Sequence, residues 1–261
     1  MHLTLLGGAD SAGFARDLAE LLDDGDELSI VFNTARDMWA HGLKHSPDAD
    51  ALLTALCKGA PTIPTYAVAD DLADLGAEPS WFRPSDQDIA VQLVRTELMH
   101  AGFSLTEVTA ALAARRGIAT RLLPMTDDRV EQHVITDGPD GSRAIHVEEF
   151  LARHGDQSAK DLVLVADDWK ASREALDAIE SADVIVLGPG SLSLTLMSLL
   201  RTPGLVEAIA ASAAPVVDVR TADTAPESLA AHTRNVELFF DLTVRAEPHA
   251  AAVLSTARKL I

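Results

Sequence analysis

Apolar residues along this chain gather in short runs, and amphipathic stretches separate one run from the next. Most of the runs are apolar at consecutive positions, which is typical of strands covered on both faces of a sheet. The predicted strands are Leu3–Leu6, Leu28–Asn33, Thr120–Leu123, Leu162–Ala166, Val184–Leu187, Pro215–Val219 and Leu238–Val244.

The stretches between the predicted strands carry the 3.6-residue period of helices. Ala175, Ile179 and Ala182 fall on one helical face, and Ser104 with Glu107 forms a capping box that opens another helix. Strands that alternate with helices predict an α/β fold, Rossmann-like and doubly wound, with a mostly parallel sheet. We expect residues 1–261 to form a single domain of this kind.

The stretch 47–116 interrupts this alternation, because it predicts helices at Pro47–Lys58, Asp86–Ala101 and Ser104–Arg116 with no convincing strand between them. We interpret it as a helical insertion that lies over the strand ends. Further along the chain, Gly138-Pro-Asp-Gly141 predicts a turn, and the runs on either side of it predict a β-hairpin.

The formal net charge is -19. A surface this acidic repels phosphate backbones and anionic lipid, so we expect no nucleic-acid partner and no membrane contact. The apolar run Leu3–Leu6 ends at Gly7–Gly8 and has no positively charged segment before it, so it predicts neither a signal peptide nor an anchor. The single cysteine, Cys57, fits a reducing cytoplasm, and its neighbours predict a small buried side chain.

Two glycine-rich turns follow predicted strands and lead into predicted helices. The first contains Gly7, Gly8 and Gly13, and the second runs from Gly188 through Gly190. A strand, a glycine-rich turn and a helix together aim backbone N–H groups at a phosphate, although such a turn also occurs without any ligand. Two of them in one sheet predict a ligand that lies across the crevice between the strands.

Acidic side chains gather after the second predicted strand. Asp37, Asp48 and Asp50 lie beyond the strand end, in a predicted loop that can fold onto the same crevice. Carboxylates beside phosphates are a common way of holding Mg²⁺, with the substrate supplying further ligands. Asp48 also has a structural interpretation, because Ser46-Pro47-Asp48 is a typical helix start.

Two further features have plain structural interpretations. His41 and His45 have i,i+4 spacing but lack the glutamate of the zinc-binding H-E-x-x-H motif. Asp127 and Asp128 are adjacent acids in a turn, and such acids are usually solvated.

Taken together and in order, these segments resemble the CofD family of 2-phospho-L-lactate transferases, which includes FbiA-like members. The resemblance covers roughly residues 1–219. The stretches that carry it are His41-Gly-Leu-Lys-His-Ser-Pro-Asp-Ala-Asp50, Trp81-Phe-Arg-Pro-Ser-Asp-Gln-Asp-Ile-Ala90, Arg95-Thr96, Gly102-Phe-Ser-Leu-Thr-Glu-Val-Thr109, Leu123-Pro-Met-Thr-Asp-Asp128 and the strand from Ala182-Asp183 to Gly188-Pro189.

The resemblance implies a reaction in deazaflavin coenzyme biosynthesis. A guanosine-diphosphate-linked donor would pass a phospholactyl-type or phosphoenolpyruvyl group to the deazaflavin Fo, and guanosine monophosphate would leave. It also implies a homodimer, and it implies that Asp37, Asp48 and Asp50 are catalytic residues and ligands of Mg²⁺. The residues expected to bind the nucleotide and the deazaflavin are Gly7, Gly8, Gly13, Asn33, Thr34, Arg36, His41, Ser46, Asp127, Gly188, Gly190 and Ser191.

The chain departs from the family pattern at its expected site. Arg36 stands where the family has a carboxylate, and a cation there repels Mg²⁺ and can itself pair with phosphate. The first turn carries Asp10 and Ser11 in place of family glycines, and the turn Gly188-Pro-Gly-Ser-Leu192 is closer to the YvcK-type gluconeogenesis factors. The alternative is therefore a non-catalytic paralogue that binds a nucleotide, a nucleotide sugar or a deazaflavin as a regulatory or partner protein.

Overall fold

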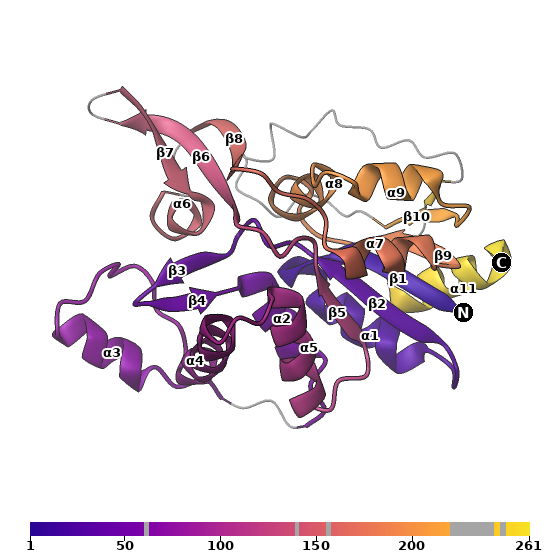
Figure 1. Ribbon diagram of the computed structural model, residues 1–261, viewed down its shortest axis with the longest axis horizontal. Helices are drawn as coiled ribbons and strands as arrows, with labels where there is room; N and C mark the ends of the chain where they lie inside the picture. Colours follow the sequence, from indigo (N-terminus) through magenta and orange to yellow (C-terminus); the bar gives the residue numbers. More distant parts are fainter. Residues whose placement is uncertain (60–62, 139–140, 155–157, 220–242, 246–248) are drawn as a thin grey trace.

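The computed structural model describes residues 1–59, 63–138, 141–154, 158–219, 243–245 and 249–261 (Figure 1). Its centre is a six-stranded sheet with the order β11-β10-β9-β1-β2-β5, and every neighbouring pair is parallel. The strands are β1 His2–Gly7, β2 Glu27–Phe32, β5 Arg121–Pro124, β9 Val184–Leu187, β10 Val216–Asp218 and β11 Thr243–Arg245.

These strands confirm the predicted α/β, Rossmann-like fold. The chain passes from β1 outward to β2 and β5, and then returns to the other side of β1 to lay down β9, β10 and β11. The strand order therefore reverses between β1 and β9, and folds of this kind bind ligands at that position. Of the last predicted strand, residues 238–242 lie outside the described residues.

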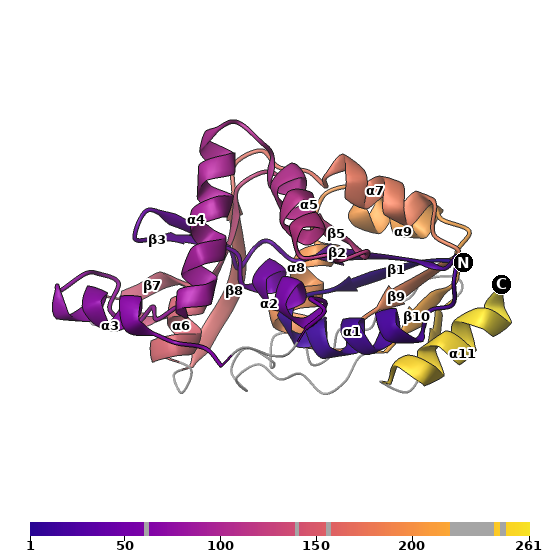
Figure 2. The ribbon, with the colours of Figure 1, turned by 90° about the horizontal axis from the view of Figure 1, so that it is seen from below.

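The strands alternate between two hydrophobic cores, one on each face of the sheet. Leu5 and Val186 belong to one core, whereas their neighbours Leu6 and Leu187 belong to the other. Figure 2 shows α1 and α11 on one side of the sheet and α7 and α9 on the other. The helices that bury residues in the first core are α1 Ala12–Leu21, α2 Pro47–Ala55, α4 Asp86–His100, α5 Leu105–Arg115 and α11 Ala250–Leu260; those of the second core are α7 Arg173–Glu180, α8 Met197–Leu200 and α9 Leu205–Ala211.

Most helices of the stretch 47–116 pack on one face of the parallel sheet. Leu52 of α2, Val91 of α4 and Val108 of α5 are buried in the same core as the sheet. One helix of the stretch, α3 Ala67–Asp74, was not predicted, and only Ala69 is buried in it. Cys57 follows α2 and is exposed, so the prediction that it is buried was wrong, because the side chain that reaches the core after the helix is that of Leu56.

A short antiparallel hairpin, β3 Met38–Ala40 and β4 Leu43–His45, occupies the segment that the sequence presented as a loop. Its two-residue turn has both residues in the left-handed region, with φ of 52° at His41 and 75° at Gly42. Such a turn suits the twist of a hairpin. The hairpin directs the segment after β2 back toward the start of α2.

A second, three-stranded antiparallel sheet has the order β7-β6-β8 and lies beside the parallel sheet (Figure 1). β6 Val130–Gly138 and β7 Gly141–His146 confirm the predicted hairpin, although residues 139–140 of its turn lie outside the described residues. β8 Ala159–Ala166 pairs antiparallel with β6, which corrects the interpretation of Leu162–Ala166 as a strand of the parallel sheet. Helix α6 Val147–Arg153 packs against β6 and β7 through Val147 and Phe150.

Within the described residues, no single helix is long and apolar enough to cross a membrane. One bent pair, Leu192–Leu200 with Leu205–Ala211, passes the same test by length and composition, with an angle of 74° between its helices.

Candidate functional site

The two glycine-rich turns meet at the carboxyl ends of β1 and β9. The hydroxyl of Ser11 donates to the carbonyl of Pro189 at 2.8 Å and accepts from the N–H of Gly8 at 3.3 Å. From the same turn, the carboxylate of Asp10 accepts from the N–H of Ser191 at 3.0 Å. Side chains of the first turn therefore join the two turns into one unit.

Glycines stand where side chains of this unit come close to the backbone. A Cβ atom on Gly7 would lie 2.4 Å from Ser11 Oγ, and one on Gly188 would lie 2.9 Å from the carbonyl oxygen of Leu6. Gly190 has φ of 137°, and a Cβ there would lie 2.7 Å from Cβ of Asp10. These glycines are needed for the packing of the turns themselves, whatever ligand they also admit.

Asp48 connects helix α2 to the first turn. Asp48 is the second residue of α2, which begins after Ser46, and its side chain is fully buried. Oδ1 of Asp48 accepts from the N–H of Ala9 at 2.6 Å, and Oδ2 accepts from Nδ2 of Asn33 at 3.2 Å. Asn33, at the end of β2, also donates to the carbonyl of Leu194 at 3.1 Å, next to the second turn. The structure therefore brings together four of the predicted site elements: both turns, Asn33 and Asp48.

Arg36 lies between two carboxylates. Its Nε atom donates to Oε1 of Glu148 at 2.7 Å, and its Nη1 atom lies 3.8 Å from Oδ1 of Asp48. Burial alone would lower the pKa of Arg36, but the carboxylates of Asp48 and Glu148 outweigh it and raise that pKa, so the guanidinium stays charged. Burial raises the pKa of Asp48 to about 6, although Arg36 and the N–H of Ala9 oppose this effect.

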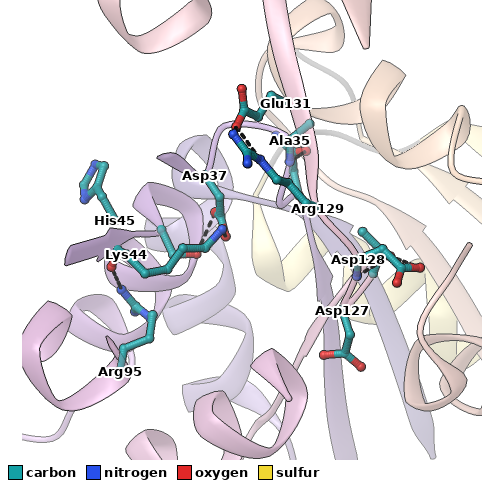
Figure 3. A network of polar contacts seen from close by, with 12 residues as sticks. Ala35, Asp37, Lys44, His45, Arg95, Asp127, Asp128, Arg129 and Glu131 are labelled. Carbon is teal, nitrogen blue, oxygen red and sulfur yellow. Dashed lines mark hydrogen bonds and ion pairs between the residues drawn. The ribbon is translucent and has the colours of Figure 1, made fainter. Parts of the chain in front are cut away.

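Asp37 is held by two side chains of the segment that follows it, Ser46 and Lys44. Its Oδ1 atom accepts from the hydroxyl of Ser46 at 2.7 Å, and its Oδ2 atom lies 3.0 Å from Nζ of Lys44 (Figure 3). Thr34, three residues before Asp37, is buried, and within the described residues its hydroxyl has no hydrogen-bond partner. Lys44 adds a second cation to the group around Arg36.

Asp50 takes part in a separate ion pair. Arg95 of α4 is fully buried and donates to both carboxylate oxygens of Asp50, with Nη1 at 3.2 Å from Oδ2 and Nη2 bonded to Oδ1. Nη1 also donates to the carbonyl of Lys44 at 3.3 Å, which ties the ion pair to strand β4. Asp50 therefore has a structural partner of its own.

Three predicted binding residues lie apart from this group. Gly13 is exposed within α1, with open space around it. Asp127 follows β5 (Figure 3). Its carboxylate accepts from the N–H and the hydroxyl of Thr106 at 2.8 and 3.1 Å, so it holds the start of α5. His41 lies in the β3–β4 turn, with its ring 6.0 Å from that of Phe82. For these three residues, a binding role stays a prediction.

The donor atoms do not fit the magnesium site that the resemblance implies. Mg²⁺ requires oxygen ligands at about 2.1 Å. A cation of the chain already lies beside each carboxylate: Arg36 is 3.8 Å from Asp48, Lys44 is 3.0 Å from Asp37, and Arg95 donates to Asp50 at 3.2 Å. Across the described part of the chain, no three His, Cys, Asp or Glu side chains form a group that would hold a metal ion.

Several residues of the site were missed by the sequence reasoning. Glu148 comes from α6, 112 positions after Arg36, and nothing local in the sequence connects the two. Lys44 and Arg95 lie within stretches that carried the family resemblance, so that resemblance was an available signal for both of them.

We expect Gly8→Ala to destabilise the fold by about 1–3 kcal/mol, because overpacking of a tight site has a cost of that order. The new Cβ atom would lie 2.3 Å from Oδ1 of Asp48 and would push that carboxylate off the N–H of Ala9. Urea denaturation followed by circular dichroism measures the change. Gly13→Ala is the matched control, and it should be neutral or stabilising by up to about 1 kcal/mol, since Gly13 occupies an exposed position of helix α1 with open space around it. Equal effects of the two substitutions would contradict this account of the turn.

The parallel sheet has a site at the carboxyl ends of β1, β2 and β9, where the strand order reverses and the two glycine-rich turns are joined. These features define a Rossmann-like α/β protein. A family model described as 2-phospho-L-lactate transferase CofD matches residues 3–239. The chain belongs to this family, which was predicted from the sequence. The family description, together with the names of relatives, indicates a transferase.

Relatives with curated names are similar over most of this chain. A phosphoenolpyruvate transferase of Kitasatospora aureofaciens is 37% identical over 224 residues, which cover 82% of this chain and 70% of the relative. A phosphoenolpyruvate transferase of Nocardia farcinica is 34% identical over 229 residues, which cover 83% of this chain and 69% of the relative.

The solved structures that resemble the chain concern its fold. A UPF0052 family protein from Bacillus halodurans has two crystal structures that match at 22% identity. One match has a TM-score of 0.64 and covers 99% of this chain and 84% of the solved chain. The other has a TM-score of 0.60 and covers 83% of this chain and 68% of the solved chain.

Proposed function

We propose that this chain transfers a phosphoenolpyruvyl or phospholactyl-type group from a guanosine-diphosphate-linked donor to the deazaflavin Fo. The observation that carries the proposal is the match to the CofD family over residues 3–239. The names of the relatives favour phosphoenolpyruvate as the acid of the donor.

In the proposed reaction, the terminal hydroxyl of Fo attacks the donor phosphorus that bears the acid group and loses its proton to solvent, and guanosine monophosphate leaves with the electron pair of the broken P–O bond. Alignment and charge neutralisation are the main contributions that a protein makes to such a transfer. Arg36 and Lys44 supply fixed positive charge at the end of β2, in a chain whose formal net charge is -19. They are the residues that we expect to face the phosphates of the donor.

The acceptor requires a surface for a flat ring system. The ring of Phe82 lies 4.8 Å from that of His45, 5.9 Å from that of Trp81 and 6.0 Å from that of His41, measured between centroids. This aromatic group lies at the β3–β4 hairpin, which also carries Lys44. We propose that the deazaflavin stacks here, because aromatic faces favour offset or edge-on contact with other rings.

The second candidate function is binding without transfer. It is favoured by the way in which the chain's own carboxylates occupy backbone N–H groups of both turns: Asp48 at Ala9 and Asp10 at Ser191. A turn occupied in this way offers fewer N–H groups to a phosphate. Such a protein would bind a nucleotide, a nucleotide sugar or a deazaflavin and pass on a signal or meet a partner.

The test is incubation of the chain with Fo and guanosine-diphosphate-linked phosphoenolpyruvate or phospholactate. Chromatography measures the release of guanosine monophosphate, and mass spectrometry measures the mass added to Fo. The transferase predicts equal amounts of both products. Binding of donor or Fo without release of guanosine monophosphate would instead support the non-catalytic alternative.

We expect Arg36→Ala to lower kcat/KM for the donor by about tenfold or more, since a lost charge-assisted contact to phosphate is worth about 1.4 kcal/mol or more. Arg16→Ala is the matched control, because Arg16 pairs with Asp17 on the exposed surface of α1. An unchanged kcat/KM for Arg36→Ala would place the donor phosphates elsewhere.

A further inference from the structure

The charged side chains near the end of β2 form ion pairs with one another. Asp48, Glu148 and Asp37 supply three carboxylates, and Arg36 and Lys44 supply two cations among them. Asp48 and Asp37 are buried, and the side chains of Arg36 and Lys44 are each 12% exposed. Each cation therefore pairs with at least one of these carboxylates and still reaches solvent.

We propose that in this chain Arg36, together with Lys44, takes the place of a divalent cation, so that the site binds a phosphate-bearing ligand without metal. The phosphate-bearing ligand is the one named by the proposed function, and this part of the inference rests on it. The part that concerns metal affinity depends only on the contacts of the chain itself.

A fixed cation lies beside the carboxylates that would hold Mg²⁺. Each oxygen of Asp48 accepts one N–H group, at 2.6 and 3.2 Å, and keeps a further lone pair, so the neighbouring cation is what opposes a metal ion. Glu148 accepts from Arg36 at 2.7 Å, and Nη1 of Arg36 lies 3.8 Å from Asp48. A metal ion bound between Asp48 and Glu148 would have to displace the guanidinium or lie beside it, and like charges at such a distance repel strongly.

The guanidinium can do for a phosphate what the metal ion would do. Within the described residues, Arg36 contacts carboxylates through Nε and Nη1, and a guanidinium has five N–H donors in one plane. Its other N–H groups are available to phosphate oxygens, for which this planar arrangement is well suited. Glu148 holds Nε and so fixes the orientation of the plane, which makes Glu148 a positioning residue.

The first experiment uses Mn²⁺ alone as the probe, in place of Mg²⁺, and measures free Mn²⁺ by electron paramagnetic resonance during a titration. The wild-type chain is expected to show no saturable binding at millimolar Mn²⁺. Arg36→Met, which keeps the apolar stem of the side chain, should gain a saturable site, because Asp48 and Glu148 then face each other without a cation. Arg36→Lys and the exposed control Arg16→Ala should behave like the wild type. Circular dichroism checks that each variant is folded.

The second experiment is calorimetry with guanosine diphosphate, once in EDTA and once in excess Mg²⁺. The affinity of the wild type is expected to agree within about twofold between the two conditions, and Arg36→Met should lose about tenfold or more in EDTA. Saturable binding of Mn²⁺ to the wild type, a wild-type affinity that falls tenfold in EDTA, or no gain of Mn²⁺ binding in Arg36→Met would overturn the inference. A wild type that binds no nucleotide in either condition counts against the proposed function, whereas the Mn²⁺ titrations still decide whether Arg36 excludes the metal.

Discussion

Arg95→Ala is expected to lower the free energy of unfolding by about 3–5 kcal/mol, because removing one partner of a buried ion pair leaves the other charge uncompensated. Arg95 is fully buried on α4, and both of its terminal nitrogens bind the carboxylate of Asp50 on α2. Its bond to the carbonyl of Lys44 would be lost as well. Urea denaturation at pH 7, followed by circular dichroism, measures the loss.

Two further variants separate this ion pair from simple loss of packing. Arg95→Met combined with Asp50→Leu removes both charges and should cost less than Arg95→Ala alone, since no unpaired charge remains. Arg153→Ala breaks an exposed pair with Glu149 and should change stability by less than about 1 kcal/mol. A double variant less stable than Arg95→Ala would show that the charges themselves are not what makes Arg95 important.

The regular part of the fold was predictable because its signal is local. Consecutive apolar residues such as Leu3–Leu6 and Val184–Leu187 must be covered on both faces, and the two cores do cover them. The strand Leu162–Ala166 carries the same pattern, yet it pairs antiparallel with β6. Within this run only Leu162 is buried and Val165 is 51% exposed, so the pattern predicts a strand, whereas the burial and the partner of that strand depend on residues far away in sequence.

The hairpin β3–β4 was missed for a different reason. Each of its strands has three residues, and Trp39 in the first of them is 43% exposed, so no apolar alternation marks it. Its turn, His41-Gly42, needs the left-handed conformation at a histidine, which is uncommon outside glycine. The aromatic contact between His45 and Phe82, which the sequence places 37 positions apart, helps to hold what the local residues do not specify.

The site was partly predictable for similar reasons. Asn33 follows the end of β2, and Asp48 lies at the start of α2. These two positions, each visible in the local sequence, bring the side chains together at the crevice. Glu148 reaches Arg36 only because the β6–β7 hairpin carries α6 back over the end of β2. Asp127 has the expected position after β5, and its carboxylate accepts from the N–H and the hydroxyl of Thr106 at the start of α5, where backbone N–H groups have no partner within the helix.

The burial of Asp48 predicts that this carboxyl group destabilises the fold as the pH rises. Most carboxylates with a partner in the folded state have the opposite effect. The pKa of Asp48 is about 6 in the folded chain, chiefly because of burial, and about 3.9 is typical of an unfolded chain. A raised pKa means that the folded state is favoured when Asp48 is protonated. This contribution, about 3 kcal/mol, is fully present below pH 4, declines as the pH rises, and is absent above about pH 6.

The variant Asp48→Asn isolates the effect, because its amide does not ionise and any lost hydrogen bond has a cost that does not depend on pH. We expect the difference in unfolding free energy between wild type and Asp48→Asn, measured by urea denaturation, to fall by about 2 kcal/mol from pH 4 to pH 7. Asp17→Asn removes an equal charge from the exposed surface of α1 and measures the general effect of net charge. A difference for Asp48→Asn that stays constant across this range would mean that Arg36 and the N–H of Ala9 compensate for the burial of the carboxylate completely.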